Sequence, residues 1–233
     1  MVTKRAPRKP LGRRPASDDI DPREHLLDTA TQLFSRHGIA ATTVGQIASA
    51  AGVASALVHY YFTNRESLLD AVAEERLARA AAFVWSPAQD DAEADPFALV
   101  EQFVERLLDV IERLPWLPAL WLREVVGEGG LLRERMIQRL PFDTLHRFGA
   151  RVAQAQRDGT VSPQLDPMLL FNSILGLVML PFATAAVWQG RGGLPALDRD
   201  TLRQHVIALL TGGMRPRARP AASRRRTPSR KKP

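Results

Sequence analysis

The stretch that most constrains this chain is Thr43–Phe62, which reads as two short helices joined by a tight turn. Thr43 and Gln46 have the spacing of a capping box, in which the hydroxyl accepts a backbone N–H and the amide reaches back. Gly52 stands where the first helix ends, because glycine enters the left-handed backbone region without steric cost. Apolar residues then recur at helical spacing in the second segment: Leu57, Val58 and Tyr61. The pattern predicts a helix-turn-helix, whose short helices need neighbours to pack on.

The flanks of this stretch supply two such neighbours. Asp21-Pro22 predicts the start of a helix, with aspartate as the N-cap and proline in the first turn. Its apolar stripe has helical spacing: Leu26, Ala30, Leu33 and Phe34. Asn64 is a suitable N-cap for a long helix that runs towards Val84. We therefore expect a small three-helix domain over residues 21–68, from which this last helix enters a second domain.

The second domain, residues 69–213, shows apolar residues at helical spacing and no alternating pattern typical of a strand. Residues 85–95 are rich in Ser, Pro, Gln and acids and predict a loop. Helices are predicted from Phe97 to Ile111, Trp116 to Val126, Leu131 to Arg157 with a bend at Pro141, Met168 to Trp188, and Asp198 to Leu210, the last ended by Gly212-Gly213. The predicted fold is all-α, with an N-terminal helix-turn-helix domain and a larger C-terminal helical domain.

Positive charge is concentrated at the two ends of the chain. Residues 1–20 hold six Lys or Arg against two Asp, and residues 214–233 hold nine Lys or Arg and no acid. Both segments are rich in Pro and Ala, so we expect disordered tails. The N-terminal tail leads into the helix-turn-helix, which favours contact with DNA phosphates. For the C-terminal tail, phosphate contact and a role in solubility alone are equally supported.

The run from Arg23 to Leu69 resembles the DNA-binding domain of the tetracycline-repressor (TetR-like) family of transcriptional regulators. The resemblance rests on LFSRHGIAATTVGQIASAAGV, on a second helix that ends in HYYF, and on TNRESLL. Family members typically read TLYHYFPSKEEL where this chain has LVHYYFTNRESL. The motif covers about a fifth of the chain. It implies a dimeric regulator that binds a palindromic operator in double-stranded DNA and responds to a small molecule, most often as a repressor.

The resemblance also implies which residues contact DNA. Base edges are expected to face Ser55, Ala56, Leu57 and His59. Phosphates are expected to contact Thr43, Tyr60, Tyr61 and Arg65, whose hydroxyls and charge suit that role.

Three residues of the reading segment depart from the family pattern. Ala54 stands where Ser or Thr usually caps the second helix, and this should weaken the helix start by about 0.5–2 kcal/mol. Leu57 favours contact with a thymine methyl over a hydrogen bond. His59 replaces a common Tyr, and a solvated histidine is nearly as well supported as a base contact. For Tyr60 and Tyr61 the alternative is packing, with Tyr61 expected to have its ring partly in the domain core.

The last two long helices are those that form the dimer in the family, which implies a homodimer through about residues 166–188 and 198–210. Met168–Trp188 contains 21 residues without a charge, which is long enough to span a bilayer of about 30 Å. Polar residues and a proline interrupt this segment, and no second such segment is present: Asn172, Ser173, Pro181 and Thr184. We expect a buried dimer and pocket helix and no membrane contact.

The family's second domain usually holds a small-molecule pocket. The clue to its position is polar and aromatic residues within apolar runs: Trp121, Arg123, Glu124, His146 and Asn172. For each of these residues alone, a structural ion pair, a surface position or a core hydrogen bond is better supported than ligand contact.

The sequence proposes no catalytic residues, no metal site and no cofactor. It contains no Gly-rich phosphate loop, no HExxH and no nucleophile elbow, and it has five His and no Cys. We expect a cytoplasmic protein, because the basic N-terminus is not followed by the apolar stretch of a signal peptide. Two alternatives to a specific regulator remain: a non-specific DNA-coating protein that uses the basic tails, and a membrane-attached regulator.

Overall fold

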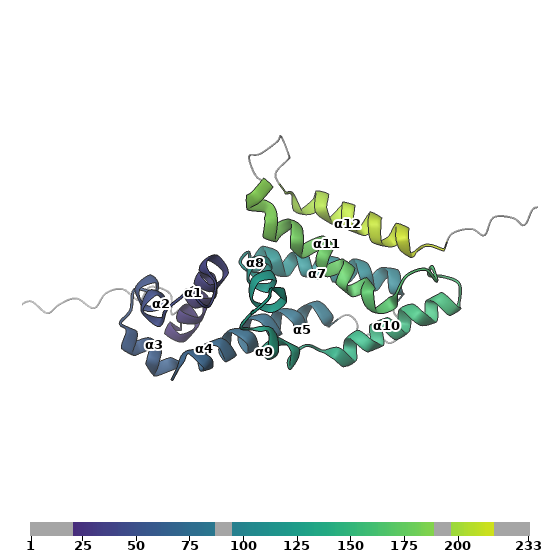
Figure 1. The fold of residues 1–233 in the computed structure, drawn as a ribbon. Helices are drawn as coiled ribbons and strands as arrows, with labels where there is room; N and C mark the ends of the chain where they lie inside the picture. Colours follow the sequence, from purple (N-terminus) through teal and green to yellow (C-terminus); the bar gives the residue numbers. More distant parts are fainter. Residues whose placement is uncertain (1–20, 87–94, 189–196, 217–233) are drawn as a thin grey trace, which may run out of the picture.

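The computed structural model describes residues 21–86, 95–188 and 197–216. The two predicted tails, residues 1–20 and most of 214–233, lie outside these ranges. Every regular element in the described ranges is a helix, in agreement with the predicted all-α fold. Figure 1 shows α1, α2 and α3 gathered at one end of the molecule, and the long helices of the second domain beyond them.

The N-terminal domain contains α1 (Pro22–His37), α2 (Val44–Ala50), α3 (Ser55–Tyr61) and α4 (Arg65–Val72). The Asp21 side chain accepts the Arg23 N–H, as predicted for the N-cap of α1. α2 and α4 both begin with capping boxes, at Thr43 and Asn64. The core of the domain is formed by apolar residues from all four helices: Leu26, Leu27, Ala30, Phe34, Ile47, Ala48, Val58, Phe62, Leu68 and Leu69.

α4 continues without a break into the wider turns of a π-helical segment, η1 (Ala73–Ala78), and then into α5 (Arg79–Trp85). The boundary predicted at residues 68 and 69 therefore falls inside a helix that joins the two domains. Arg76 in η1 is 9% exposed and bonds the carboxylates of Glu24 and Asp28 on α1, each at 2.8 Å. Next to it, the hydrogen bond from Arg23 holds the pKa of the Glu75 carboxyl below its usual range.

The second domain contains α7 (Pro96–Arg113), α8 (Leu117–Trp121), the π-helical segment η2 (Leu122–Val126), α9 (Arg133–Ile137), α10 (Phe142–Arg157), α11 (Pro167–Trp188) and α12 (Arg199–Met214). α12 packs on α7, and α11 packs on α7, α8 and α10 (Figure 1). Trp85, at the end of α5, lies in an aromatic cluster with Phe171 and Phe103, at ring-centroid distances of 4.0 and 5.0 Å. This cluster joins the incoming helix to the body of the domain.

Two predicted helix limits in the second domain were wrong. Residues 131–157 form two helices and not one bent helix, because Pro141 has no N–H to continue α9 and instead precedes α10. α12 continues through Gly212-Gly213 to Met214, which is fully buried. The Met214 carbonyl accepts the Ser162 N–H at 2.8 Å, so this residue belongs to the domain and not to the predicted tail.

α11 is apolar on nearly all its faces, and Pro167–Ala185 is long and apolar enough to cross a membrane by length and composition. Only 28% of this stretch is buried in the protein. Large apolar side chains are therefore exposed along α11 and on α12: Met168, Leu169, Leu180, Val187 and Leu209.

Candidate nucleic-acid interface and ligand cavity

The turn between α2 and α3 has the geometry that its sequence predicts. Gly52 has φ +70°, and a Cβ there would meet no atom within 4 Å, so backbone conformation and not space requires glycine. The Val53 N–H donates to the Ala48 carbonyl at 2.9 Å, which closes the end of α2. Ala54 makes no side-chain cap for α3, as expected from its methyl group.

The side chains expected to read base edges lie mainly on the solvent face of α3. Ser55, Ala56 and His59 are exposed, and Tyr60 is 78% exposed although its ring is large and apolar. This face carries a hydroxyl, a methyl group, an imidazole and a phenol and no carboxylate. Such a surface can approach a polyanion without charge repulsion.

The opposite face of α3 holds the helix on the domain. Val58 is buried, and Leu57 and Tyr61 are half-buried against the core. The rings of Tyr60 and Tyr61 meet edge to face, with centroids 5.1 Å apart. The prediction that the Tyr61 ring lies partly in the core is confirmed, and the base contact expected for Leu57 stays a prediction.

Thr43 and Arg65 lie at the starts of α2 and α4. Thr43 is exposed, and its hydroxyl and backbone N–H are used in the capping box with Gln46. Arg65 donates to the carbonyls of Ile39 and Thr42 and so ties α4 to the loop after α1. Its guanidinium therefore has a structural role, and a phosphate contact by this residue stays a prediction.

The joint between the domains is formed by η2 and the end of α1. Glu124 is 5% exposed, and one carboxylate oxygen accepts the Ile39 N–H at 2.9 Å while the other accepts the Leu131 N–H at 3.3 Å. Arg123 donates to the Ser35 carbonyl at 3.3 Å. Arg123 thus attaches the second domain to the end of α1, and Glu124 attaches it to the loop that precedes α2.

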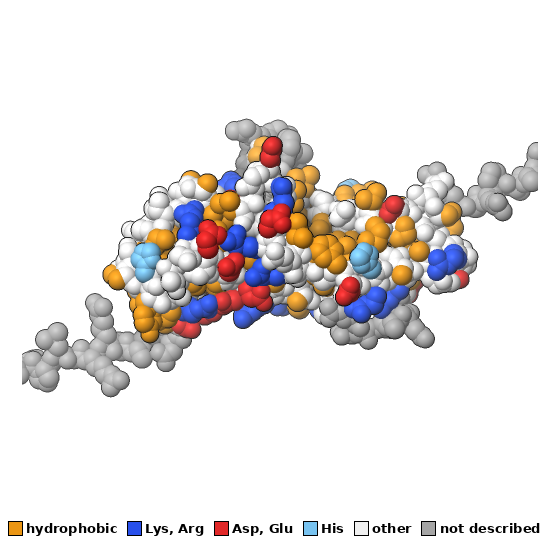
Figure 2. Space-filling view, turned by 60° about the horizontal axis from the view of Figure 1, so that its bottom comes forward, with side chains coloured by type: hydrophobic (Ala, Val, Ile, Leu, Met, Phe, Trp, Pro, Cys, Tyr) orange, Lys and Arg blue, Asp and Glu red, His pale blue; other side chains and the backbone are white. Residues whose placement is uncertain are grey.

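Ion pairs from α9 and from the turn after it form a second attachment, to the helix that joins the two domains. Arg135 bonds Glu66 and Asp70 of α4, and Arg139 bonds Glu74 of η1 at 2.6 Å. Figure 2, which brings the lower side of Figure 1 forward, shows basic and acidic side chains interleaved across the middle of this face. Hydrophobic side chains gather beyond them, over the second domain.

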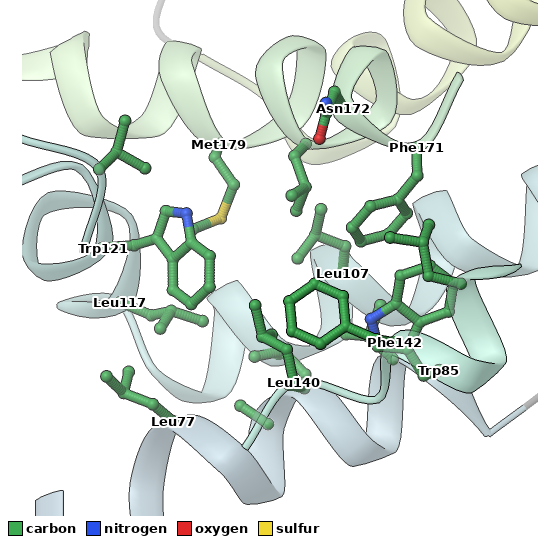
Figure 3. A pocket seen from close by; sticks show the side chains of 17 residues that line it. Leu77, Trp85, Leu107, Leu117, Trp121, Leu140, Phe142, Phe171, Asn172 and Met179 are labelled. Atoms are coloured by element: carbon green, nitrogen blue, oxygen red, sulfur yellow. The ribbon is translucent and has the colours of Figure 1, made fainter. Parts of the chain in front are cut away.

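The second domain contains an apolar cavity of about 280 Å³ between α5, α7, α8, α10 and α11 (Figure 3). Aliphatic and aromatic side chains form nearly all of its wall: Leu77, Ala80, Ala81, Val84, Trp85, Leu107, Val110, Leu117, Trp121, Val126, Leu140, Phe142, Leu145, Phe171, Leu175 and Met179. Asn172 supplies the one polar residue in this lining. Mostly apolar cavities with a few polar groups are typical of small-molecule sites.

Two of the five predicted ligand residues line this cavity, namely Trp121 and Asn172. The other three do not: Arg123 and Glu124 lie in the domain joint, and His146 is exposed on α10. Sequence reasoning missed Trp85 and Phe142. Trp85 follows an apolar helical stripe but is the first residue of the segment whose composition predicts a loop. Phe142 follows Pro141, which predicts only a bend in a helix. Among the described residues, no three His, Asp or Glu side chains are grouped so that they could hold a metal ion.

Comparison with known proteins agrees with the helix-turn-helix described above. Residues 26–72 match the model of the family described as bacterial regulatory proteins, tetR family. The chain is 33% identical over 64 residues to the transcriptional regulator AcrR of Shigella flexneri, covering 28% of this chain and 30% of that protein. The chain is 23% identical over 185 residues to the transcriptional regulator YhgD of Bacillus subtilis, covering 78% of this chain and 91% of that protein.

Two solved structures show that the whole fold is shared. AibR in complex with isovaleryl coenzyme A and operator DNA superimposes with a TM-score of 0.64 at 21% identity, covering 81% of this chain and 97% of that one. The ketosteroid regulator KstR2 of Mycobacterium tuberculosis gives a TM-score of 0.64 at 21% identity, with 87% and 99% covered. With its helix-turn-helix, its family match and this shared fold, the chain belongs to the TetR family of DNA-binding transcriptional regulators.

Proposed function

We propose that this protein is a dimeric, ligand-responsive repressor that reads a palindromic operator through α3 and binds a small molecule in the cavity of its second domain. The observation that carries the proposal is the division of α3 into two faces. Val58, Leu57 and Tyr61 hold the helix on its domain, while Ser55, His59 and Tyr60 face solvent on a surface without acids. That division positions side chains for the major groove.

The exposed apolar surface of α11 and α12 supports the dimer. One helix-turn-helix domain contacts about one half-site. Specific binding therefore requires two such domains on one duplex, with their α3 helices roughly 34–36 Å apart. Leu180 on α11 and Leu209 on α12 are each about half exposed in the single chain. A second copy that packs on these helices would remove this surface from water.

The effector acts in this proposal by selecting between two arrangements of the dimer. A ligand that binds one arrangement better shifts the population towards it, and the spacing of the two α3 helices then no longer fits the operator. AibR was crystallised with both isovaleryl coenzyme A and operator DNA, which is a precedent for a fold that accepts both. The cavity reaches α8, whose continuation η2 carries the Glu124 contact to the N-terminal domain.

Protection mapping on genomic fragments tests the DNA-binding proposal. We expect a protected near-palindrome with two half-sites about one helical turn apart. A variant that lacks residues 1–20 and 217–233 should keep the same site preference with a shallower salt dependence. Equal protection of unrelated sequences, or complete loss of binding in this variant, would instead support a non-specific DNA-coating protein that uses its tails.

Leu180→Glu tests the dimer, because it places a charge on the exposed face of α11. We expect the native protein to sediment at about twice 25.8 kDa and the variant as a monomer, with at least a tenfold loss of operator affinity. Ile137→Glu is the matched control, since Ile137 is an exposed apolar residue on α9 and should leave the dimer intact.

Fractionation of cells that express the native protein or Leu180→Glu distinguishes the dimer from the membrane-attached alternative. A cytoplasmic dimer is recovered without detergent, and burial of α11 against its partner then accounts for the apolar face. Recovery of the native protein in the membrane fraction, with release by Leu180→Glu, would contradict the dimer and support an anchor.

A further inference from the structure

The polar groups of the cavity are few, and all of them are uncharged. Asn172 lies on α11 and is exposed, so water can satisfy its amide. Among the lining side chains, the other polar atoms are the indole nitrogens of Trp85 and Trp121. Figure 3 shows these two indoles on opposite sides of the cavity.

The indole N–H groups lack partners. Within the described residues neither Trp85 nor Trp121 makes a hydrogen bond, although Trp85 is only 3% exposed. An indole is a hydrogen-bond donor and never an acceptor. A ligand that presents an acceptor atom to either indole would pair with a donor that makes no bond within the described part of the protein.

The cavity offers nothing to balance a charge. The charged side chains that follow Trp121 in the chain are turned to the domain joint, where Arg123 bonds Ser35 and Glu124 bonds Ile39. An ionised group that entered the cavity would lose its water without gaining a counter-ion, which is strongly unfavourable. A neutral acceptor loses much less.

Access from solvent is through the side formed by η2 and the start of α10. Val126 and Phe142 both line the cavity, and they are 57% and 42% exposed. Phe142, together with Leu140, also borders a smaller apolar space of about 40 Å³ beside the main cavity. The lining on this side of the cavity is therefore apolar, and the exposed amide of Asn172 lies on α11.

We infer that the molecule recognised by this cavity is uncharged and largely apolar, with one hydrogen-bond acceptor such as a ketone or ester carbonyl. Free carboxylates are excluded from the interior. The inference rests on the proposed function only in treating the cavity as an effector site. Binding itself requires neither DNA nor a particular response.

Three ten-carbon probes of nearly equal size test the inference: 2-decanone, decane and decanoate at pH 7.5. Affinity is obtained from thermal shifts of the full-length protein without DNA, read by far-ultraviolet circular dichroism. We expect 2-decanone to bind at least tenfold more tightly than decanoate, and decane serves as the probe without an acceptor. Equal or tighter binding of decanoate, or no binding of 2-decanone within its solubility, would overturn the inference.

Variants that remove one N–H while keeping an aromatic ring identify the donor. In Trp85→Phe or Trp121→Phe, the affinity for 2-decanone should fall by about threefold to tenfold, while the affinity for decane stays the same. An unchanged affinity for 2-decanone in both variants would overturn the role of the indoles. Two variants are needed because Trp85 also packs in the aromatic cluster, whereas Trp121 is half-buried.

Operator affinity measured with each probe present separates this inference from the proposed function. If 2-decanone binds as expected but leaves operator affinity unchanged, the ligand class stands and the proposed effector response fails. If operator release follows decanoate alone, the effector response stands and the ligand class is wrong.

Discussion

An aspartate in place of Ser55 should weaken operator binding by roughly 100-fold and leave the protein folded. Ser55 is the first residue of α3 and is exposed. In the proposed complex a carboxylate there enters the major groove, where the phosphates on both sides of the groove repel it, and the dimer carries two such carboxylates. A cost of about 1–3 kcal/mol for each helix-turn-helix domain gives about 2–6 kcal/mol for the dimer, which is a loss of about 30-fold or more and includes the expected 100-fold, since about 1.4 kcal/mol corresponds to a factor of ten.

The same substitution should not harm the helix. Ala54 gives α3 no side-chain cap, and an acid in the first turn interacts favourably with the positive end of a helix. We therefore expect a melting temperature equal to that of the native protein or slightly above it. This separates loss of DNA binding from loss of structure.

Two controls accompany the binding measurement, which is made by fluorescence anisotropy at two salt concentrations. Ser55→Ala removes the hydroxyl without adding charge and should cost a few-fold at most. Ala150→Asp adds the same charge at an exposed position of α10 and should have no effect. Native affinity in Ser55→Asp would mean that the first turn of α3 does not face DNA.

Most of the fold was predictable because its signals are local. Asp21, Asp95 and Asp166 each precede a proline and accept backbone N–H groups at the start of their helices, as was predicted for Asp21-Pro22. The Gly52 turn forms as its sequence indicates. Helix ends without such signals were predicted less well: α12 continues through Gly212-Gly213 because Met214, beyond them, is buried in the core.

The ligand cavity was less predictable because its wall is assembled from distant segments. Trp121 and Asn172 were identified, but the Trp85 ring becomes part of the wall through packing on Phe171, 86 residues along the chain. A polar residue in an apolar run indicates burial and does not identify its partner. Glu124 shows this, since the group it bonds is the Ile39 N–H in the other domain.

Replacing Glu124 with alanine should lower the free energy of unfolding by about 2–4 kcal/mol. The carboxylate is 5% exposed and accepts N–H groups from Ile39 and Leu131. Truncation leaves the Ile39 N–H buried without a partner, and that residue is fully buried. Urea denaturation followed by circular dichroism gives the change, and the midpoint should fall with little change in slope.

Glu124→Ala should destabilise the loop before α2 locally, in addition to lowering the stability of the whole protein. Ile39 lies in the loop between α1 and α2, so its amide hydrogen should exchange faster in Glu124→Ala than in the native protein, while amides in α7 lose protection only by the global amount. Glu124→Gln keeps an acceptor oxygen for Ile39 but adds two donors, and an intermediate loss is expected. A smaller loss of stability in Glu124→Gln than in Glu124→Ala would distinguish the effect of the missing hydrogen bond from the effect of the missing side-chain volume.

Glu128→Ala is the matched control, because Glu128 is exposed in the same connection and makes no hydrogen bond or ion pair in the described structure. Its stability should remain within about 0.5 kcal/mol of the native value. A Glu124→Ala variant as stable as this control would mean that the joint does not depend on the buried carboxylate. The expected loss would instead show that the loop before α2 is held in place by a residue three positions after Trp121 in the cavity wall.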